Sequence, residues 1–399
     1  MDNKTGLASW EAIVVDKMPS LSKPEAVVLA MWSFGIVISQ SCGVNNVSVF
    51  LAALLNVKEN SMRQRLREWY KEANAKKGEK REEVDVTTCF VPLVKWVLSW
   101  WSSDEKQLAL AMDASSLGKR FVVLAISIVY RGCAIPVAWI VLREGVKGEW
   151  RTHWEALFGH LHEAIPADWT VIVLADRGLY ARWLYVAIKK NGWHPFLRVN
   201  HTYGTFCRQG TSQFLPLKIA LPAQGQCWSG QVTCFKTNPL DCTLLACWGE
   251  QHADPWLILT DLVPNQADVF WYSLRAWIEC GFKQAKRAGW QWHQTRMTDP
   301  QRATRLWLAI AVATLWVVSV GGEAEENLPA SSFDALPLAH FARTLSPCDF
   351  FRRSVSCFRR GLLVIFATLL AHRPFPTGNF RPEPWPTLDH NSFVSIDST

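Results

Sequence analysis

Two aspartates end apolar runs, at positions where a buried charge needs compensation. Asp113 ends LALAMD and Asp176 ends VIVLAD. A lone aspartate at such a place often serves as a helix cap or turn former. Two of them on neighbouring strands, joined by Glu279 from a helix that packs against those strands, would repel one another unless a cation bound them. Oxygen ligands of this kind suit Mg²⁺ or Mn²⁺, and two such ions about 4 Å apart activate a water or a 3′-hydroxyl and stabilise the departing oxygen of a phosphodiester.

The stretch 265–290 predicts one helix, with Asn265 as its cap, Asp268 in its first turn and Gly289 at its end. At 100° per residue, an apolar arc adjoins a polar stripe that lies within about 60°. The stripe consists of Tyr272, Arg275, Glu279 and Lys286. An ordinary salt-bridged helix is the alternative interpretation, because Arg275 and Glu279 form an i,i+4 pair. With the carboxylates nearby, Lys286, Arg275 and Tyr272 would instead hold phosphates next to the scissile bond.

The elements that must position these residues follow from the hydrophobic period. Runs at 108–116, 121–130 and 134–143 predict an antiparallel meander, and strands at 170–175 and 195–200 alternate with helices at about 150–164 and 180–190. Residues 203–254 alternate like strands at 231–235 and 243–248, and the strand 256–260 then returns to the core. The order predicts an α/β fold with a ribonuclease-H-like mixed sheet and a β-rich insertion, preceded by an all-helical domain.

The first 85 residues are predicted to be helical, with helices from Pro24 to Ser39, from a Ser48 cap to Asn56, and from a Ser61 cap to about residue 75. The last of these carries Arg63, Arg65 and Arg67, and the pair of short helices resembles a helix-turn-helix. We therefore expect these arginines to contact DNA, with an ordinary solvated helix as the alternative. The charged stretch 76–83 indicates a linker, and the proline-rich tail beyond His372 indicates an extended surface segment or disorder.

Composition limits the class of protein. Of the 399 residues, 49% are hydrophobic and 19% charged, so the chain is not disordered, and the net charge of +7 suits a polyanionic partner. The 11 cysteines, an odd number without a signal peptide, indicate reduced thiols in a cytoplasm. Cysteines cluster between residues 227 and 247 without a CxxC pair, which favours buried strand thiols over a zinc site. The apolar run 306–320 is shorter than the ~20 residues of a membrane span and indicates a core helix.

The spacing of Tyr272, Arg275, Glu279 and Lys286 resembles the YREK signature of DDE-type insertion-sequence transposases that cut and paste through DNA hairpins. The resemblance covers about residues 108–320, and in it Asp113, Asp176 and Glu279 fall on the DDE triad. Arg177 belongs to the DRG that matches the motif of the second aspartate. Trp256, which opens WLILTDL, falls on the tryptophan that stacks a base flipped from the hairpin. The interval from Trp256 to Tyr272 is short for the family, and the N-terminal domain and the region beyond residue 320 are unmatched.

The resemblance implies two Mg²⁺ or Mn²⁺ ions per active site. It also implies as partners double-stranded DNA (terminal inverted repeats and target DNA) and a homodimer in the synaptic complex. Location in the bacterial cytoplasm, on the nucleoid when DNA is bound, and no membrane partner are expected.

The predicted division is a helical DNA-binding domain at 1–85, a catalytic core at 86–202 and 255–322, a β-rich insertion at 203–254 and a C-terminal helical region with a proline-rich tail at 323–399. Three alternatives stay open: a ribonuclease-H-like nuclease that does not join strands, a catalytically silent DNA-binding protein derived from a transposase, and an integral membrane protein.

Overall fold

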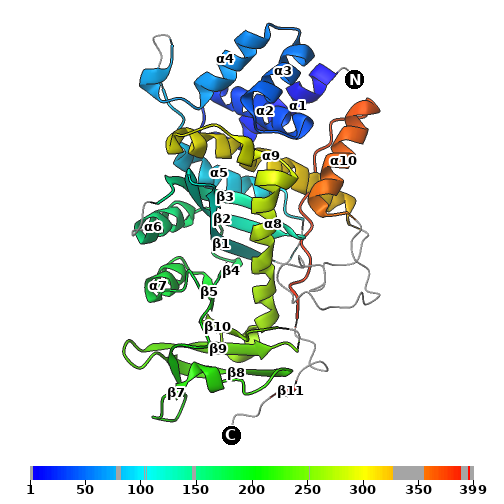
Figure 1. Cartoon of the computed structure of the whole chain (residues 1–399). Coiled ribbons are helices and arrows are strands. Elements are labelled where there is room, and N and C mark those ends of the chain that lie inside the picture. The colour runs from blue at the N-terminus through cyan, green and yellow to red at the C-terminus, as the bar shows by residue number, and fades with distance from the viewer. Residues whose placement is uncertain are drawn as a thin grey trace.

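The computed structural model describes residues 3–77, 82–102, 104, 106–145, 150–250, 252–326, 355–387 and 394–395. One long mixed sheet runs through the molecule, with the N-terminal helices at one end and the insertion at the other (Figure 1). Its first five strands are β1 (Gln107–Leu117), β2 (Phe121–Tyr130), β3 (Cys133–Arg143), β4 (Thr170–Ala175) and β5 (His194–Arg198).

These five strands lie in the order β3-β2-β1-β4-β5. β1, β2 and β3 form an antiparallel meander, whereas β4 pairs parallel to β1 and β5 parallel to β4. This arrangement is the ribonuclease-H-like sheet that the sequence predicts, so the predicted fold class is confirmed. The predicted strand bounds at 121–130 and 170–175 agree with β2 and β4 residue for residue.

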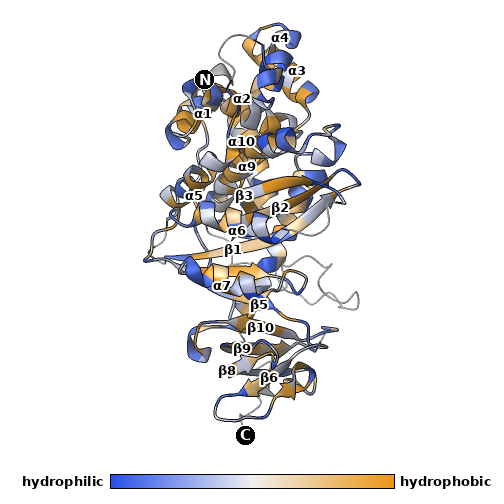
Figure 2. Ribbon diagram, turned by 90° about the vertical axis from the view of Figure 1, so that its left-hand side faces the viewer, coloured by the Kyte–Doolittle hydropathy of each residue, from blue (hydrophilic) through white to orange (hydrophobic). Residues whose placement is uncertain are grey.

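Helices cover both faces of this sheet, which explains why its strands are continuously apolar. Every residue of β2 is buried, and β2 and β3 are largely hydrophobic in Figure 2. α6 (Trp150–Leu161) and α7 (Arg182–Lys190) lie on one face, and the helical column that contains α8 (Trp277–Lys283) lies on the other (Figure 1).

The predicted β-rich insertion extends the same sheet. β10 (Trp256–Thr260) pairs antiparallel with β5 on one side and with β9 on the other, so the insertion continues outward from the core as β9-β8-β6-β7. Its elements are β6 (Thr205–Arg208), β7 (Leu215–Pro216), the 3₁₀ turn η3 (Leu217–Ile219), β8 (Gln226–Cys234) and β9 (Leu240–Trp248). The short β11 (Val394–Ser395) pairs with β8.

The stretch 265–290 is not one regular α-helix, and that prediction is wrong in detail. A short turn η4 (Pro264–Gln266) precedes a 3₁₀ segment η5 (Val269–Ala276), which continues as α8 and ends in a π-helical turn η6 (Gln284–Ala288). Asp268, not Asn265, caps it by accepting a hydrogen bond from the Phe270 N–H. Changes of helical pitch rotate the side chains relative to a uniform wheel, but the apolar side chains of Leu274, Ile278 and Phe282 are still buried. Another 3₁₀ turn follows, η7 (Trp292–Gln294).

The N-terminal region is helical, as predicted, but its caps differ. Gly43 and Lys58 stand at the cap positions that were assigned to Ser48 and Ser61, and Ser48 instead lies buried inside a helix. The elements are α1 (Asn3–Lys17), α2 (Lys23–Ser39), α3 (Val44–Leu55), α4 (Glu59–Trp69), the 3₁₀ turns η1 (Ala73–Ala75) and η2 (Val86–Cys89), and α5 (Phe90–Ser99). Part of the predicted linker, residues 78–81, lies outside the described residues.

α9 (Pro300–Ala324) is the central helix between the N-terminal helices and the sheet. At 25 residues it is longer than the predicted run 306–320, and its length and composition would suffice to cross a membrane. In its most apolar window, however, 94% of the residues are buried inside the protein, as expected for a core helix. α2 and α3 would together pass the same length test but are bent by 99°.

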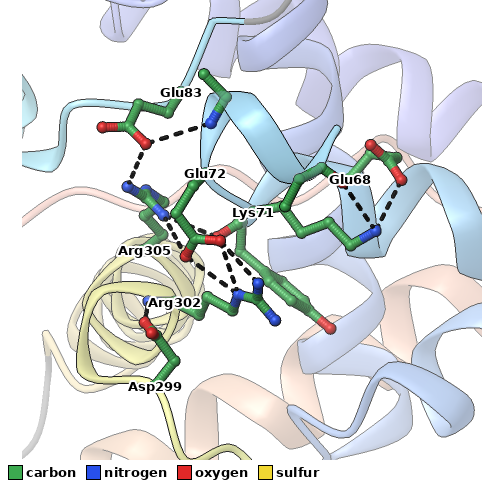
Figure 3. A network of polar contacts seen from close by, with 10 residues as sticks. Glu68, Lys71, Glu72, Glu83, Asp299, Arg302 and Arg305 are labelled. Carbon is green, nitrogen blue, oxygen red and sulfur yellow. Dashed lines mark hydrogen bonds and ion pairs between the residues drawn. The ribbon is translucent and has the colours of Figure 1, made fainter. Parts of the chain in front are cut away.

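A charged network joins the N-terminal helices to α9 (Figure 3). Glu72 accepts hydrogen bonds from Arg302 at 2.7 Å and 3.1 Å and lies 3.5 Å from Arg305. Arg305 is buried and also pairs with Glu83 at 3.0 Å. Since Asp299 caps α9 one turn before Arg302, the start of this helix is fixed both within itself and to the preceding domain.

The C-terminal tail was predicted to be an extended surface segment or disordered; its described part is extended, but it is anchored by buried side chains. After α10 (Cys357–Leu370), an extended strap runs beside the α8 column toward the insertion (Figure 1). Phe380 is fully buried and bridges to Trp101, and the Tyr130 hydroxyl donates to the Arg381 carbonyl at 3.0 Å. Trp385 packs against Trp271 with ring centroids 4.9 Å apart.

Candidate active site

Asp113 and Asp176 lie side by side just beyond the last paired residues of the parallel strands β1 and β4. In the β1–β4 register Ala111 faces Leu174, and each aspartate follows its register residue by two positions. Each of them uses one carboxylate oxygen locally. Asp113 Oδ1 accepts from the N–H of Ala114 at 2.8 Å, and Asp176 Oδ1 accepts from the N–H groups that follow it at 2.9 and 3.2 Å. Asp176 therefore forms a turn after β4, whereas Asp113 lies within β1, and neither aspartate uses its second oxygen in these local bonds.

Those second oxygens meet the guanidinium of Arg275. Arg275 Nη2 lies 2.8 Å from Asp113 Oδ2 and 3.5 Å from Asp176 Oδ2, and its Nη1 lies 2.7 Å from Glu279 Oε1. The structure thus brings the three predicted carboxylates together around one buried cation. The predicted i,i+4 pair of Arg275 and Glu279 is present, but it is one part of this larger cluster.

The charges of the cluster shift one another's proton affinities. Burial raises the pKa of Asp113 to about 6, with Arg275 opposing the rise and the carboxylates of Asp176 and Glu279 adding to it. Burial disfavours the charged form of Arg275, but Tyr272 and the carboxylates outweigh burial and raise the pKa of Arg275. Burial also raises the pKa of Tyr272 to about 12. The cluster is an electrostatic unit in which one positive charge offsets several negative ones.

Lys286 lies apart from the carboxylate cluster, although it belongs to the same predicted stripe. Its ammonium donates to Ser115 Oγ at 2.7 Å and to the Ser116 carbonyl at 2.6 Å, at the end of β1. Burial lowers its pKa, and neighbouring Arg287 lowers it further. The π-helical turn η6 carries Lys286 to this position.

Trp256 lies at the first position of β10, half-buried and next to Tyr272, with ring centroids 5.4 Å apart. His252 and Phe270 complete an aromatic group around it, at 5.4 and 6.0 Å. Burial lowers the pKa of His252, and the charge of Arg198, at the end of β5, lowers it further. The sequence interpretation missed His252 and Arg198; the only available signal was their position next to strand ends on the same edge of the sheet.

The remaining predicted DNA-binding residues are not part of this cluster. Arg177 forms an ion pair with Asp254 at 3.1 Å, at the end of the insertion. Arg63, Arg65 and Arg67 lie on α4 in the N-terminal region, where Arg63 pairs with Glu59 and the other two are exposed. α3 and α4 are joined by a short turn, as a helix-turn-helix requires, and α4 is largely hydrophilic (Figure 2). DNA contact by these residues stays a prediction.

The donor set of the cluster fits a divalent metal ion in its chemistry, because three carboxylates supply hard oxygen ligands. As the side chains stand, no group of three or more His, Cys, Asp and Glu in the described part of the chain is arranged to hold a metal ion. Arg275 lies between the three acids, and its positive charge neutralises part of their negative charge. A metal ion would therefore have to replace this guanidinium.

The sheet with its gathered carboxylates places the protein among the ribonuclease-H-like folds. Comparison with known proteins identifies the family. The model of the transposase DDE domain matches residues 111–316, which is more than half of the 399-residue chain. The chain belongs to this family, whose members generally depend on divalent metal ions. The match begins just before Asp113 and includes Asp176 and Glu279.

Among solved structures, the chain is similar to a piggyBac transposase in a synaptic complex with hairpin DNA. The two are 10% identical, the alignment covers 93% of this chain and 79% of the other, and the TM-score is 0.40. A search of the curated proteins finds no match.

Proposed function

We propose that this transposase cuts DNA at the ends of a mobile element by metal-dependent phosphodiester hydrolysis and hairpin formation, and joins the 3′ ends to target DNA. The observation that carries the proposal is the convergence of Asp113, Asp176 and Glu279 on Arg275 at the carboxyl edge of β1 and β4. Three acids in contact with one cation are poorly explained by stability alone, because buried charges are costly even when they are paired.

The three carboxylates would hold Mg²⁺ or Mn²⁺, with two ions per site. Bound ions would activate the attacking hydroxyl and stabilise the departing oxygen. Among the residues that the structure describes, the ion pairs of Arg275 are with the acids that would become metal ligands, so metal binding would free its guanidinium for a DNA phosphate close to the reacting bond. Lys286, fixed 2.7 Å from Ser115, would hold a further phosphate at a constant position.

Trp256 would receive a base flipped from the bent end of the DNA. Its indole is half-buried at the start of β10, with one neighbour, Tyr272, belonging to the proposed phosphate-binding helix. Stacking on an aromatic ring of this kind is worth ~1–3 kcal/mol per base, which would help to stabilise a hairpin after its terminal pair has opened.

Two other functions stay possible for a chain of this family. A nuclease would hydrolyse DNA without joining strands, and a silent derivative would bind DNA without cutting it. We favour the transposase because the three carboxylates gather around Arg275 and Lys286 lies in the cleft that adjoins them. We also propose that the protein acts in the bacterial cytoplasm and as a homodimer that holds two DNA ends.

The test uses purified protein, Mg²⁺, a plasmid that carries the inverted repeats flanking the coding sequence, and a separate target plasmid. If the protein is a transposase, we expect excised ends with hairpins, and joined products in the target plasmid. Cleavage without any joined product would favour the nuclease, and binding without cleavage would favour the silent derivative.

A further inference from the structure

A cleft adjoins the carboxylate cluster on the side of the β1–β2 turn. It has a volume of about 860 Å³, and Asp113 and Glu279 are among the residues that line it. The end of β1 and the turn after it form one wall, from Ala114 to Arg120, and the end of α8 with the π-helical turn η6 forms the other. The cleft is therefore continuous with the site where the chemistry is proposed to occur.

Positive charge dominates this cleft outside the two acids of the cluster. Four of its lining residues are cations: Arg120, Lys283, Lys286 and Arg287. Arg120 is fixed by the backbone carbonyls of Thr295 and Met297, and Lys286 by the end of β1. Both carry their charge at defined positions, as a binding site requires.

Lys283 and Arg287 differ from these two, because both are exposed and neither has an acidic partner among the residues that the structure describes. They are four positions apart across the junction of α8 and η6, a spacing at which like charges destabilise a helix. Burial lowers the pKa of Lys286 and the nearby charge of Arg287 lowers it further, so Arg287 repels a second cation in this cleft. A polyanion in the cleft would relieve their repulsion.

The two sides of the carboxylate cluster differ in chemistry. In the strand order β2-β1-β4-β5-β10, the acids on β1 and β4 lie between the cationic cleft at the β1–β2 turn and the aromatic group of Trp256 on β10. Bases suit the aromatic side and backbone phosphates suit the cationic side. A DNA strand that crosses the cluster would therefore meet a different kind of contact on each side of its reacting phosphate.

On this basis, and resting on the proposed function, we propose that the cleft binds the phosphodiester backbone of the DNA on the far side of the scissile phosphate from Trp256. Before cleavage this is the donor DNA that flanks the element. Lys283 and Arg287 are its phosphate contacts.

The experiment measures binding of two duplexes in EDTA by fluorescence anisotropy over a range of salt concentrations. One duplex carries the element end and continues into donor DNA, and the other stops at the cleavage position. Each phosphate contact contributes about 0.9 to the slope of log K against log[salt]. The double variant Lys283→Gln with Arg287→Gln should make the slope on the continuing duplex less steep by about 1.8. The slope on the shorter duplex should stay nearly unchanged.

The matched control is Lys95→Gln with Lys190→Gln, which removes the same charge from exposed positions on α5 and α7. This pair should leave both slopes close to wild type. An equal loss of slope on both duplexes, no loss on either, or an equal loss in the control pair would overturn the proposal.

Failure of the proposed function gives a different result. Wild-type protein that binds the element end no more tightly than an unrelated duplex would contradict the transposase function. The cleft would then be tested on the unrelated duplex, where the Lys283 and Arg287 pair must still lower the slope relative to the control pair for the cleft to be a DNA-binding site.

Discussion

Arg275 should be the main stabiliser of the site when no metal is present, and its replacement by glutamine gives a quantitative test. The substitution Arg275→Gln removes the guanidinium that contacts Asp113, Glu279 and Asp176 at 2.8, 2.7 and 3.5 Å. A charge pair about 4 Å apart near a protein surface interacts by about 4 kcal/mol, and desolvation offsets part of that. Since the acids are partly exposed, we expect a net loss of about 3 kcal/mol in the free energy of unfolding.

The expected change in melting temperature follows from chain length. Unfolding entropy of about 2.1 cal/mol/K per residue gives roughly 0.8 kcal/mol/K for 399 residues, so 3 kcal/mol corresponds to about 4 °C. The assay is calorimetry in EDTA and again with saturating Mn²⁺. In Mn²⁺ most of the difference should disappear, because the metal supplies the missing positive charge. Arg275→Lys should fall between wild type and Arg275→Gln in EDTA.

Two outcomes would refute this account of Arg275. If Arg275→Gln melts at the wild-type temperature in EDTA, the guanidinium does not stabilise the acids. If Mn²⁺ raises the melting temperature of wild type and variant equally, metal and guanidinium do not compete for the same carboxylates.

Three further predictions concern other parts of the molecule. Trp256→Ala should still nick DNA but accumulate nicked ends with little hairpin, and Trp256→Phe should recover part of the hairpin; a variant that melts several degrees lower and loses both steps together would show a packing role instead. Glu72→Gln should lower the free energy of unfolding by about 1.5–3 kcal/mol at pH 7. Hydrogen bonding from Arg302 lowers the pKa of Glu72 from 4.5 to about 2, so this difference from wild type should persist above pH 4.5 and vanish as the pH falls through 2; calorimetry across pH would show a constant difference if the reasoning is wrong. Light scattering of the protein with end DNA should show two protomers, and complete excision by a single protomer would contradict the dimer.

The core of the fold could be predicted because its signals are local. Apolar runs separated by clear turns define β1 to β5 and β10, and most predicted bounds are correct within a residue or two. The two aspartates could be placed together because each ends an apolar run and the two runs form parallel neighbouring strands. The family model independently matches this same region, residues 111–316.

The departures arise from tertiary contacts that no local pattern encodes. A wheel of constant pitch places Arg275 on the same stripe as Lys286, but the change from 3₁₀ to α to π helix separates them: one contacts the acids and the other the end of β1. The proline-rich tail lacks any helical or strand period, yet it is fixed by Phe380 and Trp385 against residues more than a hundred positions away. The cationic cleft likewise joins a turn near Gly118 to a helix near Lys283.

The central claim is that Asp113, Asp176 and Glu279 form one metal-dependent site that cuts DNA. Its most direct test is cleavage of end DNA in Mg²⁺ by the three single alanine variants, each measured beside its binding of the same DNA. We predict that each variant loses cleavage and keeps binding close to wild type, because metal ligands and not DNA contacts are removed. Cleavage at a near wild-type rate by any one of the three variants would contradict the claim.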